Sequence, residues 1–207
     1  MRIIETEADV AEGAEALAAV CPRLAHALTV IGAPPLRRRE DGFAALMQAI
    51  VSQQVSVASA RAIWGRVEAA GLAEEAAVRR SSDDDLRACG LSRPKIRYAK
   101  AIAEAGLDYG ALRTLPEEEA VATLTAVKGI GVWTAEIYLM FAVGRADVFA
   151  PGDLALRESA RALYDLPERP PEPALREMAE AWRPWRSVAA RILFAYYHHV
   201  KGREGAV

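Results

Sequence analysis

The sequence predicts an all-α fold, and three observations carry this prediction. Apolar residues recur at helical spacing in segment after segment, and no segment shows the sustained alternation of a half-buried strand. Glycine and proline fall between these periodic segments, where they end helices and form turns. With 207 residues, 52% of them hydrophobic, the chain can bury a full core in one compact domain or in two small lobes.

The helices expected before residue 110 are marked by their start and stop signals. A serine followed by acidic residues, or by a proline in the first helical turn, opens a helix, and a glycine ends it. The expected helices cover residues 8–20, 22–31, 43–51 and 57–70, then run from Ser82 to Gly90 and from Ser92 to Gly106.

The later helices follow the same rules. Thr114 and Glu117 are spaced as a capping box, in which a hydroxyl and an acid satisfy free backbone N–H groups, and the helix that they open is expected to reach Val127. An apolar helical pattern restarts at Val132 and stops at Gly144. The remaining expected helices cover residues 154–164, 172–181 and 187–200.

The turn between two of these helices, Lys128-Gly-Ile-Gly-Val132, is the most informative stretch of the chain. Gly129 and Gly131 permit a positive φ and let a ligand approach the main chain closely. The helix that follows opens with free N–H groups and the positive end of its dipole, which suits a phosphate. A tight helical corner inside a core is the alternative interpretation of the turn alone.

A second motif follows the turn at a fixed distance. The segment Asp147-Val-Phe-Ala-Pro-Gly-Asp153 combines a short extended piece, a Pro-Gly break and an aspartate at the start of a helix, 20 residues after Trp133. Together the two motifs resemble the helix-hairpin-helix DNA glycosylase superfamily. The resemblance covers residues 43–197 and implies that the protein binds DNA through the hairpin and that Asp153 is its catalytic carboxylate.

The residue at position 133, here Trp133, distinguishes the two types of reaction found in that superfamily. In members that also cut the DNA backbone, a lysine occupies this position and attacks the sugar. Tryptophan offers no amine, so simple hydrolysis of the N-glycosidic bond is expected. Its electron-rich face attracts cationic rings such as 3-methyladenine and 7-methylguanine. The chain is therefore most similar to the DNA-3-methyladenine glycosylase II family, although a core aromatic under the hairpin is the alternative interpretation of Trp133.

The resemblance also assigns the remaining site residues. Phe194 matches a pocket aromatic of these glycosylases, and Ile137 stands where a pocket tyrosine is found in relatives. Gln54 matches the residue that enters the gap left by the extruded nucleotide, while capping of a helix junction is the alternative for both Gln53 and Gln54. The residues expected to contact DNA are Gln53, Gln54, Lys128, Gly129, Gly131 and Thr134. By analogy, the carbonyls of Thr125, Val127 and Ile130 hold a monovalent cation.

Charge and composition bear on how the protein would bind DNA, on its cofactors and on its location. The formal net charge of −2 argues against long-range attraction as the main source of DNA affinity, which leaves local patches and backbone N–H groups. Cys21 and Cys89 offer neither a disulfide framework nor a four-cysteine cluster, so we expect no iron–sulfur cluster and no required cofactor. The charged N-terminus and the short apolar run at 137–143 favour a cytoplasmic protein without a membrane span.

These inferences combine into one expectation. We expect a two-lobed helical bundle, with one lobe built from residues 1–41 and 146–207 and the other from residues 42–145, and with an active-site cleft between the lobes that holds Trp133 and Asp153. The expected protein is a monomeric, monofunctional DNA glycosylase that excises alkylated purines from double-stranded DNA in base excision repair. A bifunctional glycosylase/lyase for oxidised bases and a non-enzymatic helix-hairpin-helix DNA-binding module are the alternatives.

Overall fold

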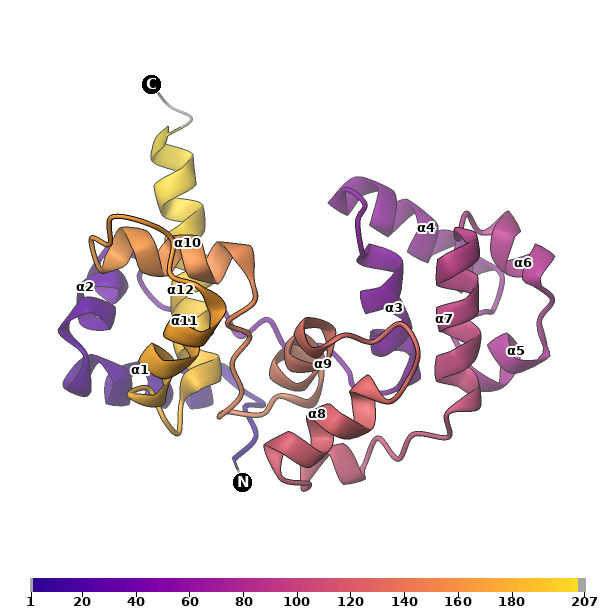
Figure 1. The fold of residues 1–207 in the computed structure, drawn as a ribbon, viewed down its shortest axis with the longest axis horizontal. Coiled ribbons are helices and arrows are strands. Elements are labelled where there is room, and N and C mark those ends of the chain that lie inside the picture. Colours follow the sequence, from indigo (N-terminus) through magenta and orange to yellow (C-terminus); the bar gives the residue numbers. More distant parts are fainter. Residues whose placement is uncertain (1, 205–207) are drawn as a thin grey trace. The chain divides into compact units, whose positions relative to one another are not determined.

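The computed structural model of the chain describes residues 2–204, which form helices joined by short connections (Figure 1). Within these residues no strand forms, and an isolated antiparallel bridge pairs Ile3 with Arg145. The all-α prediction is confirmed. No helix in the described part of the chain is both long enough and apolar enough to cross a bilayer.

The chain divides into two compact units, the first made of the residues up to Arg38 and those from Leu139 onward, the second of Arg39–Tyr138. The helices of the first unit are α1 (Glu7–Val20), α2 (Pro22–Ile31), a π-helical turn (Leu139–Val143), α10 (Leu154–Leu163), α11 (Glu172–Glu180) and α12 (Arg186–Glu204). Those of the second are α3 (Phe43–Ser52), α4 (Val57–Ala69), α5 (Glu75–Arg80), α6 (Asp83–Ala88), α7 (Arg93–Glu104), a 3-10 turn (Ala111–Arg113), α8 (Glu117–Thr125) and α9 (Val132–Tyr138).

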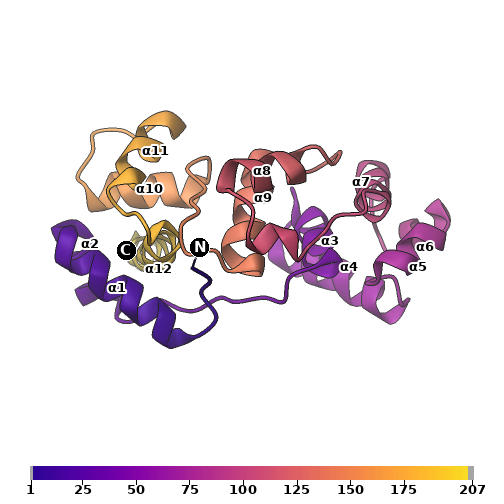
Figure 2. The same cartoon turned by 90° about the horizontal axis from the view of Figure 1, so that it is seen from below.

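The first unit is assembled around α12. This helix packs against α1, α2 and α10, which surround it when it is viewed end-on (Figure 2). Its inner face buries Val188, Ile192 and Leu193 completely. Arg191 is also fully buried, and its guanidinium donates hydrogen bonds to three backbone carbonyls, those of Leu36, Met140 and Ser187. Burial lowers the pKa of Arg191 to about 10.

The second unit is assembled around α3. This helix packs against α4, α7 and α9, and α7 in turn packs against α5 and α6. Phe43, Leu46, Met47, Ile50 and Val51 of α3 are all buried, as expected for a short helix that is surrounded by others. The hairpin helices α8 and α9 pack against each other within this unit. A rigid core therefore supports both the hairpin and the end of α3.

Two helix predictions need correction. The capping box expected at Thr114 does not form, because the Thr114 hydroxyl donates to the carbonyl of Ala111 and Pro116 is the N-cap of α8. The expected helix from Val132 to Gly144 is α-helical only to Tyr138 and continues as a π-helical turn, which ends before Gly144 with its φ of 81°. The short helix α5 was not predicted, since six residues are too few for a clear period.

Candidate active site and DNA interface

The hairpin turn joins α8 to α9 and uses its two glycines differently. Gly129 has a φ of 98°, and a Cβ atom there would overlap Cβ and Cγ of Tyr98 on α7. The fold itself therefore requires glycine at this position. Gly131 has no left-handed φ, and a Cβ atom there would point into open space. Glycine at position 131 leaves the backbone at the start of α9 accessible from outside, and backbone N–H groups at a helix start can bind a phosphate only where it can approach them closely.

The α9 side chains divide into an exposed and a buried set. Trp133 is 44% exposed in the first turn, although it is large and apolar, and Ile137 lies one turn later and is half-buried. Tyr138 is buried, and its hydroxyl accepts a hydrogen bond of 2.8 Å from the N–H of Gly42. Tyr138 therefore does not supply the pocket tyrosine that the resemblance leads us to expect at position 137, because its ring is buried in the interior. Lys128, in the turn itself, is exposed.

The turn after α3 lies against the hairpin. Gln53 Nε2 donates to Thr134 Oγ1 at 3.2 Å and to the carbonyl of Gly129 at 3.4 Å. Gln54 is exposed and adopts a left-handed φ of 54°, which is uncommon for a residue with a side chain. Thr134 is only 3% exposed. The structure thus brings four of the residues expected to contact DNA into one local cluster, in which Gln53 and Thr134 bind each other.

Asp153 is held at the start of α10 as its N-cap. One oxygen, Oδ1, accepts hydrogen bonds from the N–H groups of Ala155 at 2.8 Å and Leu156 at 3.2 Å. These two bonds fix the orientation of the carboxylate, which sits at the positive end of the helix dipole. The preceding turn is closed by a bond from the Asp153 N–H to the carbonyl of Ala150. The Pro-Gly break therefore serves to place this carboxylate.

Phe194 lies on α12 in the same unit as Asp153. Its ring centroid is 6.0 Å from that of Phe141, and the guanidinium of Arg37 lies 5.7 Å from the ring. Trp133, Ile137 and the hairpin belong to the second unit. The cleft expected between the two groups stays a prediction.

The carbonyls expected to hold a cation belong to Thr125, the last residue of α8, and to Val127 and Ile130 in the turn that follows it. The carbonyl of Val127 accepts a hydrogen bond of 3.1 Å from the N–H of Ile130, and a carbonyl oxygen has a second lone pair available for a cation. The Thr125 hydroxyl donates to the carbonyl of Val121, so this side chain closes the end of α8. Within residues 2–204, no group of three or more His, Cys, Asp or Glu side chains is placed to hold a metal ion.

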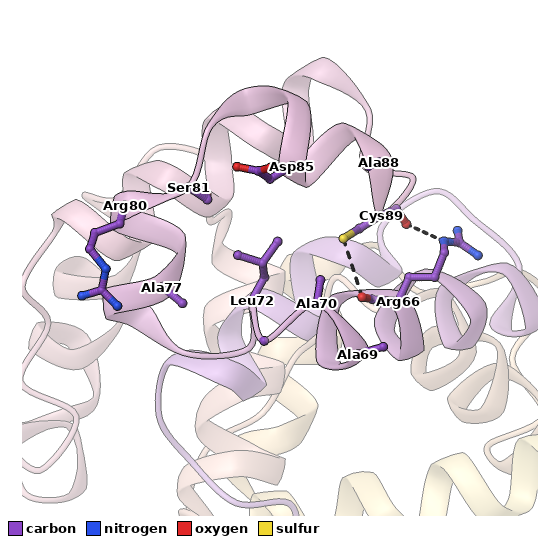
Figure 3. Close-up of a pocket in the computed structure, with 11 residues that line it drawn as sticks. Arg66, Ala69, Ala70, Leu72, Ala77, Arg80, Ser81, Asp85, Ala88 and Cys89 are labelled. Atoms are coloured by element: carbon purple, nitrogen blue, oxygen red, sulfur yellow. Dashed lines mark hydrogen bonds between the residues drawn. The ribbon is translucent and has the colours of Figure 1, made fainter.

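The second unit contains a cavity away from the expected site residues and another beside them. The larger, of about 720 Å³, opens between α4, α5 and α6 and contains none of the expected site residues (Figure 3). The Cys89 thiol in its wall donates to the carbonyl of Arg66, and burial raises the thiol pKa, so a reactive thiolate is disfavoured there. The smaller, of about 480 Å³, is lined by Gln53, Gln54, Val55, Ile63, Gly90, Ser92, Pro94, Lys95 and Tyr98.

Two residues that line the smaller cavity support the hairpin and α3. Tyr98 packs against Gly129, and Lys95 Nζ donates to the carbonyl of Val51 at the end of α3, at 2.7 Å. The loss of solvent around Lys95 lowers its pKa. Lys95 belongs to a basic stretch without acidic residues between Gly90 and Lys100, which from the sequence is either a turn that faces the DNA backbone or a solvated helix face. Neither interpretation indicates that this lysine supports α3, and Tyr98 was not predicted as a site residue.

Comparison with known proteins agrees with this geometry. Residues 47–184 match the family model described as HhH-GPD superfamily base excision DNA repair protein. The chain belongs to this superfamily. It is 34% identical over 168 residues to DNA-3-methyladenine glycosylase 1 of Schizosaccharomyces pombe, which covers 75% of this chain and 72% of that protein. The resemblance to DNA-3-methyladenine glycosylases is confirmed.

Solved structures give the same result. The crystal structure of a DNA-3-methyladenine glycosidase from Bacillus halodurans superposes with a TM-score of 0.83 at 33% identity, covering 98% of this chain and 95% of that chain. The Schizosaccharomyces pombe 3-methyladenine DNA glycosylase Mag1, solved in complex with abasic DNA, superposes with a TM-score of 0.76 at 30% identity, covering 88% of this chain and 95% of that chain.

Proposed function

We propose that this protein is a monofunctional DNA glycosylase that hydrolyses the N-glycosidic bond of alkylated purines, of the 3-methyladenine and 7-methylguanine type, in double-stranded DNA. The observation that carries the proposal is Asp153, a carboxylate fixed at the N-terminus of α10 in the loop that follows a DNA-binding hairpin. The activity named for the Bacillus halodurans and Schizosaccharomyces pombe relatives supports it.

Access to the bond comes first. A glycosidic bond inside a duplex is out of reach of a protein carboxylate, so the nucleotide must rotate out of the stack. The hairpin backbone at Gly131 and the first turn of α9 bind a phosphate, and Lys128 adds a positive charge beside them. Gln54 enters the gap that the nucleotide leaves, since it is exposed at the tip of its turn. The carbonyls of Thr125, Val127 and Ile130 would hold a monovalent cation, whose positive charge would attract the phosphate.

Bond cleavage then depends on charge. As the base departs, positive charge develops on the sugar, in an oxocarbenium-like transition state. A carboxylate about 4 Å away, at an effective dielectric near 20, stabilises that charge by about 4 kcal/mol. This corresponds to roughly a thousandfold in rate if the interaction exists only in the transition state. Asp153 supplies the carboxylate, and it also orients or deprotonates the attacking water.

Substrate choice and reaction type both follow from Trp133. Its exposed ring offers a stacking surface, and the negative face of an indole favours cationic alkylated purines over neutral bases. These bases are good leaving groups, so a single carboxylate suffices for their hydrolysis. Because the side chain carries no amine, no Schiff base forms with the sugar and the DNA backbone remains intact.

The experiment that tests the proposal analyses products. Methylated duplex DNA is incubated with the protein, released bases are identified by liquid chromatography, and the DNA strand is run on a denaturing gel with and without alkali. We expect free 3-methyladenine and 7-methylguanine, with strand breaks only after alkali. Breaks without alkali, together with a covalent adduct after borohydride treatment, would instead indicate the bifunctional lyase. Absence of any released base would contradict the proposal.

A further inference from the structure

The turn between α3 and α4 presents Gln54 in a conformation that needs support. Its φ of 54° lies in the left-handed region, which disfavours residues other than glycine unless surrounding contacts hold them there. The tip is exposed, and the neighbouring Val55 is 39% exposed, so packing around the tip supplies little of this support. The residues just before the tip must therefore fix the turn.

Two side-chain contacts do so. Lys95 Nζ on α7 binds the carbonyl of Val51, which anchors the last turn of α3. Gln53 binds the hairpin through Thr134 and the carbonyl of Gly129, residues that lie 81 and 76 positions further along the chain. The Gln53 contact links the turn that carries Gln54 directly to the hairpin, which is proposed to bind the DNA phosphate.

The hydrogen-bonding capacity of Gln53 decides its role. A side-chain amide has two N–H donors and one carbonyl acceptor. The amide nitrogen already donates to the Thr134 hydroxyl and to the Gly129 carbonyl, while DNA phosphates only accept. Gln53 cannot donate to a phosphate without giving up one of these bonds. Its carbonyl oxygen would be repelled by a phosphate.

We propose that Gln53 is a positioning residue, which couples phosphate binding at the hairpin to gap filling by Gln54, and that it does not itself contact the phosphate. The inference rests on the proposed function and deepens it. Because Gln53 fixes the turn between α3 and α4 to the hairpin, the two elements should bind DNA together. The phosphate bound by the hairpin then determines the position at which Gln54 enters the base stack. Loss of the link should weaken gap filling and leave binding to intact DNA unchanged.

Binding measurements on two duplexes test this inference. One duplex carries a single tetrahydrofuran abasic site, which presents a ready gap, and the other has the same sequence without damage. The variants are Gln53→Ala, Thr134→Val, which removes the acceptor from a side chain that is 3% exposed, Gln54→Ala and the Gln53→Ala/Gln54→Ala pair. Gln48→Ala, which removes another glutamine of α3, is the control for the substitution itself.

If Gln53 couples the hairpin to Gln54, the variants should lose affinity for the abasic duplex and not for the intact duplex. Thr134→Val, which removes one hydrogen bond, should lose about fivefold in affinity for the abasic duplex, and Gln53→Ala, which removes both bonds to the hairpin, should lose at least as much. Neither variant should lose affinity for the intact duplex. The double variant loses no more than Gln54→Ala alone, because coupled residues are non-additive. Gln48→Ala matches the wild type. Melting temperatures check folding, and Gln53→Met, which keeps the length of the side chain but loses the donors without adding a charge, should behave like Gln53→Ala if alanine proves too unstable.

Other results would distinguish failure of the coupling role of Gln53 from failure of the proposed glycosylase function. An equal loss on both duplexes would make Gln53 a phosphate contact, and additive losses in the double variant would make Gln53 and Gln54 independent; either result overturns the inference alone. A wild-type protein that does not prefer the abasic duplex and releases no base would overturn the proposed function as well.

Discussion

Replacement of Gly129 by alanine tests why the hairpin turns where it does. A residue with a Cβ atom at a left-handed φ costs about 1–2 kcal/mol. The new Cβ atom would also overlap Tyr98 close to its main chain, where the ring cannot swing away, and such overpacking costs about 1–3 kcal/mol. The sum is about 2–5 kcal/mol, which for a protein of this size lowers the Tm by about 4–20 °C.

The matched variant is Gly131→Ala, two residues later in the same turn. Nothing in the protein obstructs a Cβ atom there, so its free energy of unfolding should stay within about 0.5 kcal/mol of the wild type. Its affinity for duplex DNA should fall, since the Cβ atom stands where the phosphate approaches. Calorimetry and a DNA-binding titration measure both effects. A Gly129→Ala protein that melts like the wild type, or a Gly131→Ala protein that binds DNA equally well, would refute this reasoning.

Three further predictions concern the scaffold. Arg191→Met removes a side-chain donor from three backbone carbonyls, in two buried hydrogen bonds and one part-buried one, and should lower the free energy of unfolding in urea by about 2–5 kcal/mol. An unchanged midpoint would contradict this. The hydrogen bond from the Thr6 hydroxyl lowers the pKa of Asp9 from 3.8 to about 2. The ionised Asp9 carboxylate therefore stabilises the folded state above pH 4, and this stabilisation is lost as the pH falls through 2. Asp9→Asn should therefore destabilise the protein at pH 6 and not at pH 2, and equal losses at both would count against the assignment. In a Cys21→Ser background, Cys89 should react with a thiol reagent only after unfolding, because burial raises its pKa; rapid reaction of the folded protein would disprove this.

Local chemistry explains what the sequence predicts well. Most helices begin and end where proline, serine, aspartate or glycine dictates, because these residues satisfy or forbid particular backbone groups within a few positions. Asp153 is such a case, since its predicted place at the head of a helix is the place where it caps α10. The family could be recognised from the sequence because its motifs are short and lie at a fixed spacing.

Contacts between distant segments explain what the sequence could not predict. Nothing local to Gln53 indicates a partner 81 residues away, and nothing local to Arg191 indicates that its charge is buried against three carbonyls. The Thr114 box failed because Pro116 takes the N-cap position of α8. These features depend on how helices pack, which a single sequence does not display.

Single-turnover excision of 7-methylguanine by the wild type and by Asp153→Asn shows whether the Asp153 carboxylate catalyses base release. Asparagine is as good an N-cap as aspartate, so the variant keeps α10 capped and should keep its stability within a few tenths of a kcal/mol, roughly. It removes the negative charge and, with it, the proton acceptor for the attacking water. The account predicts a rate of base release lower by about a thousandfold at an unchanged Tm. A variant that excises at nearly the wild-type rate would show that the carboxylate of Asp153 does not stabilise the departing base's transition state.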